Sequence, residues 1–285
     1  MSNNKEKEIK NIIGYVPLRN GLKEVTTLDN YFLTYTFNQK IYWETLRNMT
    51  NIFYSAYIEH YSDTSITPIK GKIAVRTEVT HYEKVETVVP KRQDLRIESK
   101  EKVDYVEFQR KPNPDPSIGK RSVQYFGFSL TSGADKRTSH LWLINGEVGE
   151  LLHKNIFSNY ILLDETDHHP HPNINNILYV NLERLAEANT QAGELARVLI
   201  GDLKTPTDPD VKLILKNLKN SFKGFRDDNK VRDSMTRKEE IVAEAKAEAK
   251  EEKFENAQKM IEDNLSIETI VRYTGLSSEE IMQLQ

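Results

Sequence analysis

The 285-residue sequence contains no cysteine. Without thiols the chain has neither a disulfide framework nor a thiolate metal site. It also lacks any run of about 18 apolar residues, which a membrane-spanning helix needs, and its polar N-terminus has no apolar segment typical of a secretory signal. These absences predict a soluble, cytoplasmic protein without a membrane partner.

A strong net charge is missing as well. The 40 Lys and Arg residues nearly balance the 43 Asp and Glu residues, which leaves a formal net charge of -3. The whole chain therefore does not attract a polyanion, and any contact with nucleic acid must come from local basic pairs. The candidate pairs are Lys91-Arg92, Arg110-Lys111 and Lys120-Arg121.

Hydrophobic residues make up 38% of the chain, which is enough for one substantial core. Residues 1–27 show few regular signals and are predicted to be an irregular lead-in. Residues 28–232 alternate between helix and strand patterns and predict an α/β domain. Residues 233–263 consist mostly of strong helix formers and predict an exposed helical tether, while residues 264–285 predict a small helical hairpin.

A predicted β-hairpin is central to the large domain. Residues 92–97 and 104–110 both alternate with a period of two, and a polar turn separates them. If the turn is centred at residues 100–101, Asp94 lies directly across from Glu107. Two carboxylates so placed repel each other, and their oxygen atoms are the ligands that a hard divalent cation such as Mg²⁺ prefers. The alternative is a surface hairpin whose solvated face holds two acids and an amide by chance.

The same register divides the side chains of the hairpin between two faces. One face is apolar and is predicted to pack on a core. The apolar face carries Leu95, Ile97, Val106 and Phe108, and the polar face carries Asp94, Arg96, Tyr105, Glu107 and Gln109.

A helix is predicted to follow the hairpin, from about Ile118 to Leu130, with Ser117 as its cap. Arg121 and Tyr125 lie one turn apart on this helix and therefore share a face. Both can lean over the strand end that carries the carboxylates, where a guanidinium and a phenol can hold a phosphate and orient a water. The alternative is an ordinary solvated helix face.

The candidate site residues follow one another in a fixed order along the chain. They are Asp94, Glu107, Gln109, Arg121 and Tyr125. This order resembles the Rpn group, the PD-(D/E)XK nuclease family transposases, also called recombination-promoting nucleases. The segment from Asn30 to Tyr57 is similar to the opening helical region of that family, and Ser266 to Leu284 is similar to its short helical tail.

The resemblance implies a restriction-endonuclease-like core, a mixed sheet flanked by helices, followed by an α-helical C-terminal extension. It also implies a DNA endonuclease that uses Mg²⁺, for which Mn²⁺ can substitute, in DNA recombination or in defence against foreign DNA. In such enzymes the two acids and the backbone carbonyl after the second acid bind the metal, which assigns Asp94, Glu107 and Phe108 as ligands. Gln109 occupies the position of a lysine in the wider superfamily, so it can orient water but carries no charge. Stabilising charge on the phosphate then falls to the metal and to Arg121.

Two later strands are predicted at residues 138–144 and 159–164, with Asn145-Gly146 favouring a tight hairpin turn after the first. A further strand is predicted at residues 177–180. Before it lies the segment Asp167–Pro172, which contains three histidines. Its spacing does not suit a tetrahedral zinc site, and we expect none there.

Two helices are predicted to follow, at residues 182–200 and 210–225, with Pro209 in the first turn of the second. The second helix carries a basic cluster that either contacts the DNA backbone or forms a solvated face. The cluster consists of Lys216, Lys219, Lys223 and Arg226.

The C-terminal hairpin is predicted from its caps. Ser266 starts a helix that ends at Gly275, and Ser277 with Glu280 forms a capping box for another. Helix-turn-helix DNA readers look similar in outline, but the second helix here is acidic, so we favour self-association into a homo-oligomer, or docking. The apolar face consists of Ile267, Ile270, Val271, Leu276, Ile281 and Leu284.

Three functions follow from these patterns. The first is the Mg²⁺-dependent endonuclease. The second is a binding protein whose nuclease site has been lost, which the presence of both acids argues against. The third is a non-catalytic DNA-binding or regulatory protein that acts through the C-terminal helices, which the acidic last helix argues against.

Overall fold

The computed structural model describes most of the chain. The described residues are 12–18, 21–62, 65–81, 91–109, 117–131, 136–146, 155–161, 166, 174–202, 205–263 and 265–284. Contacts divide the chain into two compact units. One comprises the chain up to Val16 together with Lys23–Asp228, and the other comprises Pro17–Leu22 together with Asn229–Gln285.

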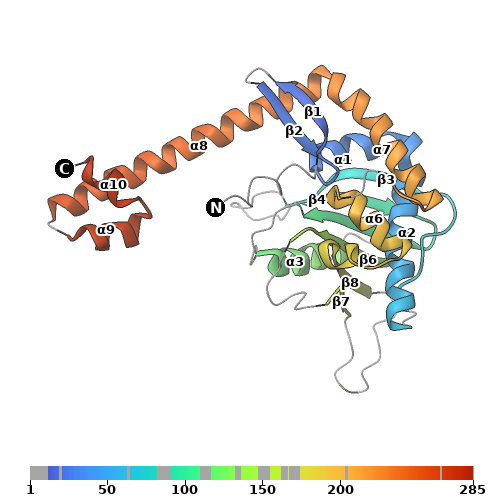
Figure 1. The fold of residues 1–285 in the computed structure, drawn as a ribbon. Helices are drawn as coiled ribbons and strands as arrows, with labels where there is room; N and C mark the ends of the chain where they lie inside the picture. Colours follow the sequence, from blue (N-terminus) through green and yellow to red (C-terminus); the bar gives the residue numbers. More distant parts are fainter. Residues whose placement is uncertain are drawn as a thin grey trace. The chain divides into compact units, whose positions relative to one another are not determined.

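The first unit is an α/β structure built on a six-stranded mixed sheet with the strand order β3-β4-β5-β6-β8-β7 (Figure 1). The first three strands are antiparallel to one another, and β4 with β5 is the hairpin that the sequence predicts, whereas β5, β6 and β8 are parallel, and β7 is antiparallel to β8. The strands are β3 (Ala74–His81), β4 (Lys91–Glu98), β5 (Lys102–Gln109), β6 (Arg137–Ile144), β7 (Phe157–Tyr160) and β8 (Ile174–Asn181).

The predicted hairpin between residues 138–144 and 159–164 is wrong. β6 lies between two parallel neighbours, and β7 pairs with β8 instead of β6. The Asn145 N–H continues the parallel ladder by donating to the Gln109 carbonyl at 2.8 Å. The physical reason is burial: β6 is buried from its second residue onward and needs partners on both sides, whereas β7 is a short edge strand that ends at the exposed Tyr160.

Helices cover both faces of the sheet. On one face, α3 (Ser117–Thr131) packs its Ile118 and Tyr125 against side chains of β6 and β8. On the other face, α2 (Trp43–Tyr61) reaches the sheet through Tyr54, whose hydroxyl donates to Asp104 of β5. Helices α6 and α7 pack against α2, and α1 packs against α7. The bounds of these and of a short 3-10 helix are α1 (Asn30–Phe37), η2 (Lys40–Tyr42), α6 (Gln191–Ile200) and α7 (Pro209–Asp227).

The two-sided cover means that β5 is buried on both faces. Val106 and Phe108 pack on the predicted core face, but Tyr105 and Glu107, on the face predicted to be polar, are only 1% and 2% exposed. A solvated hairpin face is therefore wrong for β5, because α3 covers it. Glu107 lies in the interior of the protein, where a charged group is costly.

Residues 12–26 are more regular than the predicted lead-in. They form a two-stranded sheet of β1 (Ile12–Leu18) and β2 (Gly21–Thr26). Gly14 lies against the ring of Phe222, so closely that an added Cβ would be 2.2 Å from its Cε1. Gly14 and the fully buried Val25 belong to the first unit, whereas Pro17–Leu22 belongs to the second.

The helix predicted at residues 182–200 is two helices, α5 (Leu182–Ala186) and α6. Thr190 caps α6 by accepting a hydrogen bond from the Gly193 N–H. At Gly193 an added Cβ would lie 2.0 Å from the Ala188 carbonyl oxygen, so only glycine permits this close approach of the connection to α6. The break follows from the cap and from this contact.

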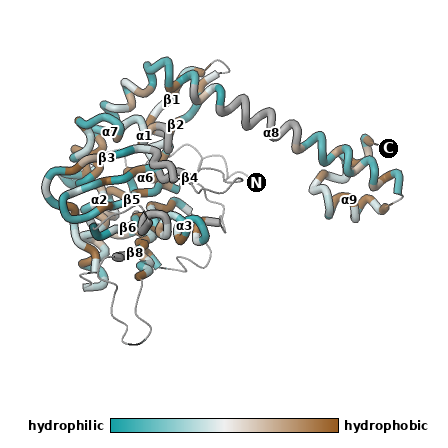
Figure 2. Tube along the Cα trace, turned by 180° about the vertical axis from the view of Figure 1, so that it is seen from behind, coloured by the Kyte–Doolittle hydropathy of each residue, from teal (hydrophilic) through white to brown (hydrophobic). Residues whose placement is uncertain are grey.

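The amphipathic helix α7 begins as predicted, with Asp208 as its cap and Pro209 at its first position. Hydrophobic and hydrophilic segments alternate along it (Figure 2). Its buried face includes Val211, Leu218 and Phe225.

The second unit contains a long helix, α8 (Asn229–Glu262), followed by α9 (Ile267–Thr274) and α10 (Ser278–Met282). The predicted caps at Ser266 and Gly275 and the capping box of Ser277 with Glu280 are all confirmed. The apolar face of this hairpin is covered within the unit. Its buried residues Ile270, Leu276 and Ile281 pack together with Ala257 of α8. In the described part of the chain, every helix is too short or too polar to cross a membrane.

Candidate functional site

Asp94 and Glu107 meet where the pairing of β4 with β5 ends. Leu95 lies opposite Val106, which is the register that the sequence predicts. Beyond this pair, the hydrogen bonds between the two strands involve the carboxyl groups of Asp94 and Glu107. The Asp94 N–H donates to Glu107 Oε1 at 3.0 Å, and the Phe108 N–H donates to Asp94 Oδ2 at 2.9 Å. Each carboxyl group therefore accepts from the main chain of the other strand, which holds both groups at one strand end.

The electrostatics of this pair disfavour the charged form of Glu107. Burial, and then the charge of Asp94, raise the pKa of Glu107 well above its usual value. A hydrogen bond between the two carboxyl groups raises it further, while the Asp94 N–H and the charge of Arg121 oppose the rise. Burial and the neighbouring carboxylate thus favour the protonated form of Glu107, because a like charge close by disfavours ionisation of a buried acid.

The donor set suits a small, hard cation. The N–H and C=O groups of one strand residue project to the same side of the strand. Since the Phe108 N–H faces Asp94, the Phe108 carbonyl projects toward β4 as well, beside the two carboxyl groups. Among the described residues, no group of three or more His, Cys, Asp or Glu side chains is placed to hold a metal ion. Mg²⁺ requires only one or two carboxylates, since it keeps several waters, so the oxygen atoms of Asp94, Glu107 and Phe108 fit it.

Helix α3 brings Arg121 and Tyr125 to the acid pair, as the sequence predicts. The two side chains are hydrogen-bonded to each other. The Tyr125 hydroxyl has a raised pKa, first because of burial and then because of the charge of Glu107, so it remains a proton donor. Tyr125 is only 6% exposed and belongs to the core under α3, which makes it less open than a solvated helix face.

Trp142 is part of this site and was not predicted. It lies directly across from Glu107 in the parallel register of β5 and β6 and is fully buried. Its ring stacks on Tyr125, with centroids 5.9 Å apart, and the Arg121 guanidinium lies 5.7 Å from the ring centroid. The indole is therefore the surface on which Arg121 and Tyr125 are held.

Gln109 lies on the same face of β5 as Glu107, two residues closer to the strand end, and is half-buried. Lys120 is exposed beside Arg121. The side chains of Lys91-Arg92 and the pair Arg110-Lys111 lie outside the described residues, as does the histidine-rich segment Asp167–Pro172.

A second group of buried charges lies on the opposite face of β5 and is separate from this site. Lys102 Nζ is 2.8 Å from Asp104 Oδ1, and the Tyr54 hydroxyl donates to the same oxygen at 2.8 Å. Lys102 also donates to the Thr67 carbonyl and lies over the Tyr54 ring. Because residues 104 and 107 alternate in direction along the strand, these groups tie α2 to the sheet and do not contribute to the acid pair.

The comparisons with known proteins do not identify a family. The restriction-endonuclease-like identity of the core and the resemblance to the Rpn group therefore depend on the residues described above. No protein-family model matches the sequence, and no curated protein or solved structure matches it either.

Proposed function

We propose that the chain is a metal-dependent DNA endonuclease with a restriction-endonuclease-like core, as its resemblance to the Rpn group implies. The observation that carries this proposal is the convergence of the half-buried Asp94 and the buried Glu107, from adjacent strands, at one strand end. A protein gains no stability from two acids in such a place, whereas a phosphodiesterase needs them to hold a cation. The mixed sheet with helices on both faces is compatible with the proposed core.

Asp94, Glu107 and the Phe108 carbonyl are the groups that would hold Mg²⁺, or Mn²⁺ in its place. When bound, the ion supplies charge stabilisation at the attacked phosphate and makes a water more acidic. Glu107 has to give up its proton before it can act as a ligand, and the nearby charge of Arg121 favours that loss.

The remaining residues position the substrate and the water. Gln109 donates and accepts hydrogen bonds and orients the attacking water. Arg121 pairs with the phosphate, and its guanidinium is held ready by Trp142 and Tyr125. Tyr125, which keeps its proton, donates a hydrogen bond toward the same place.

DNA is the proposed partner, and a homo-oligomer through the C-terminal helices remains a prediction. Lys120 is exposed and next to Arg121 in sequence, so α3 offers two basic side chains to the DNA backbone despite the net charge of -3. In the C-terminal helices and the connection before them, the large apolar residues exposed in the described part of the chain include Tyr273, 74% exposed, Met282, 53% exposed, and Leu265, 42% exposed. Sedimentation of the wild type and of a Tyr273→Ser, Met282→Ser variant tests that contact.

Plasmid nicking with Mg²⁺ tests the proposed function. We expect Asp94→Asn and Glu107→Gln each to reduce the cleavage rate by a factor of at least about 100, because loss of even a partner behind a metal ligand costs about 10- to 100-fold. A matched control is Glu101→Gln, which removes an exposed carboxylate from the turn of the same hairpin and should cleave normally. If both variants and the control cleave alike, the acid pair is not the active site. If none of the proteins cleaves but all bind DNA, the chain is a binding protein.

A further inference from the structure

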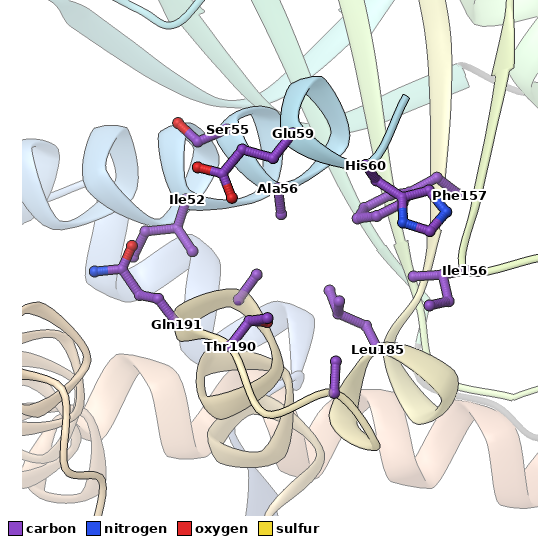
Figure 3. Close-up of a pocket in the computed structure, with 12 residues that line it drawn as sticks. Ile52, Ser55, Ala56, Glu59, His60, Ile156, Phe157, Leu185, Thr190 and Gln191 are labelled. Carbon is purple, nitrogen blue, oxygen red and sulfur yellow. The ribbon is translucent and has the colours of Figure 1, made fainter. Parts of the chain in front are cut away.

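A cavity of about 300 Å³ lies on the α2 side of the sheet (Figure 3). Its walls come from α2, from the beginning of β7 and from the connection between α5 and α6. None of the candidate nuclease residues lines it. The lining residues are Ile52, Ser55, Ala56, Glu59, His60, Ile156, Phe157, Leu185, Ala188, Thr190, Gln191 and Ala192.

The interior of this cavity is apolar. Ile52, Phe157 and Leu185 are buried residues of the core whose side chains reach its surface, and Ala56 leaves space between them. At about 300 Å³ the cavity is at the lower limit of small-molecule sites, so its occupant is a single ring or a branched aliphatic group with a short extension.

The polar groups at the rim favour a positive charge. Figure 3 shows the Glu59 carboxylate and the Gln191 amide at the same end of the cavity. The Gln191 nitrogen donates to Asp208 at 3.1 Å and to Asp210 at 3.4 Å, which leaves its oxygen as an acceptor and brings two further carboxylates to this end. No Lys or Arg is among the lining residues, and the basic side chain that does line the cavity, His60, lies at the opposite end, beside Phe157 (Figure 3).

The positive end of the α6 dipole also faces this region, because Gln191 and Ala192 open that helix. Thr190 already caps it, and the carboxylates of Asp208 and Asp210 lie beside it. Their full charges outweigh the fractional charge of a helix terminus, so the dipole does not reverse the preference.

We propose that this cavity binds a small organic cation, namely an ammonium group attached to one ring or to a branched aliphatic body. The apolar body fills the space beside Ala56, and the ammonium group pairs with Glu59 and donates to the Gln191 oxygen. This proposal does not depend on the proposed nuclease activity, and a test of one does not decide the other.

Amide NMR spectra of the full chain test the proposal with three probes that share a phenyl ring: phenethylamine, 2-phenylethanol and 3-phenylpropanoate. We expect phenethylamine to shift amides of residues 52–60 and 185–192. The alcohol should bind about fivefold more weakly and the anion more weakly still, which is the contribution of one partly exposed ion pair. Equal affinity for all three probes, or shifts elsewhere in the chain, would overturn the proposal.

Two variants separate charge from shape. Glu59→Gln, at an exposed position that does not endanger folding, should lower the affinity for phenethylamine to that for the alcohol. Ala56→Leu should fill the cavity and abolish binding of both, while Glu101→Gln should change neither. If Glu59→Gln leaves the affinity for phenethylamine unchanged, the site does not select cations, whatever Ala56→Leu does.

Discussion

Glu107 is a residue at which stability and chemistry are opposed. Its carboxyl group is buried beside that of Asp94, and its pKa is raised by burial and by that neighbour. A carboxyl group with a raised pKa in the folded state contributes most to stability at low pH. This contribution is lost as the pH rises through the folded-state pKa. The energetic cost of the site is therefore greatest at alkaline pH.

Replacing Glu107 by Gln should remove this cost, because the amide resembles the protonated acid and keeps the oxygen that accepts from the Asp94 N–H. We expect the free energy of unfolding of Glu107→Gln, relative to wild type, to increase with pH in the absence of metal. Denaturant titrations at acidic, neutral and alkaline pH measure this trend. A difference that stays constant with pH would contradict it.

Addition of Mg²⁺ or Mn²⁺ should stabilise the wild type more than it stabilises Glu107→Gln. At a free metal concentration about tenfold above the Kd, the wild type should gain about 1.4 kcal/mol of stability, since only the folded state offers the site. Asp94→Asn and Glu107→Gln should gain less. Thermal unfolding with and without the metal gives this result independently of cleavage, and an equal gain in all three proteins would place the metal elsewhere.

At the scale of secondary-structure elements, the break between α5 and α6 depends on one glycine. Gly193→Ala would bring a Cβ to 2.0 Å from the Ala188 carbonyl oxygen, so α6 would have to move. We expect a loss of about 1–3 kcal/mol in the free energy of unfolding. The matched control is Gly127→Ala in α3, where a Cβ would meet nothing within 4 Å and where alanine favours the helix. Equal effects of the two substitutions in denaturant titrations would contradict this account.

Local pairing is the part of the fold that the sequence predicts well. The register of Leu95 with Val106 follows from a short turn and period-two alternation, and the caps at Ser266 and Ser277 follow from their own neighbours. Pairing between distant segments leaves no such trace. Trp142 was therefore not assigned to the site, because its place beside Glu107 depends on β6 lying parallel to β5.

Some other features that differ from the sequence prediction could have been predicted from local residue patterns. Asn20-Gly21 in the sequence is a typical tight-turn pair, and β2 begins at its glycine. Asn189 and Thr190 favour a cap over a helix interior, and they precede α6. The burial of the polar face of β5 could not be read in this way, since Tyr105 and Glu107 look like solvated positions until α3 is placed over them.

At the scale of the whole molecule, the two units have separate cores. Leu276 is 4% exposed and packs with Ile270 and Ala257 inside the second unit. We expect Leu276→Ala to destabilise α9 and α10 by about 2–4 kcal/mol, the usual cost of a cavity in a core. Hydrogen exchange of their amides should accelerate, while exchange in β5 and β6 and the rate of DNA cleavage should stay unchanged. Faster exchange in β5 would show that the two units unfold together.

The strand order also has a consequence for how the chain is assembled during synthesis. β7 leaves the ribosome before β8, yet in the described sheet its partner is β8 alone. Phe157 and its neighbours therefore have no strand to pair with until residues 174–181 have emerged and paired with β6. The cavity that Ile156 and Phe157 line therefore cannot form on a growing chain until β8 and the connection between α5 and α6 have also emerged.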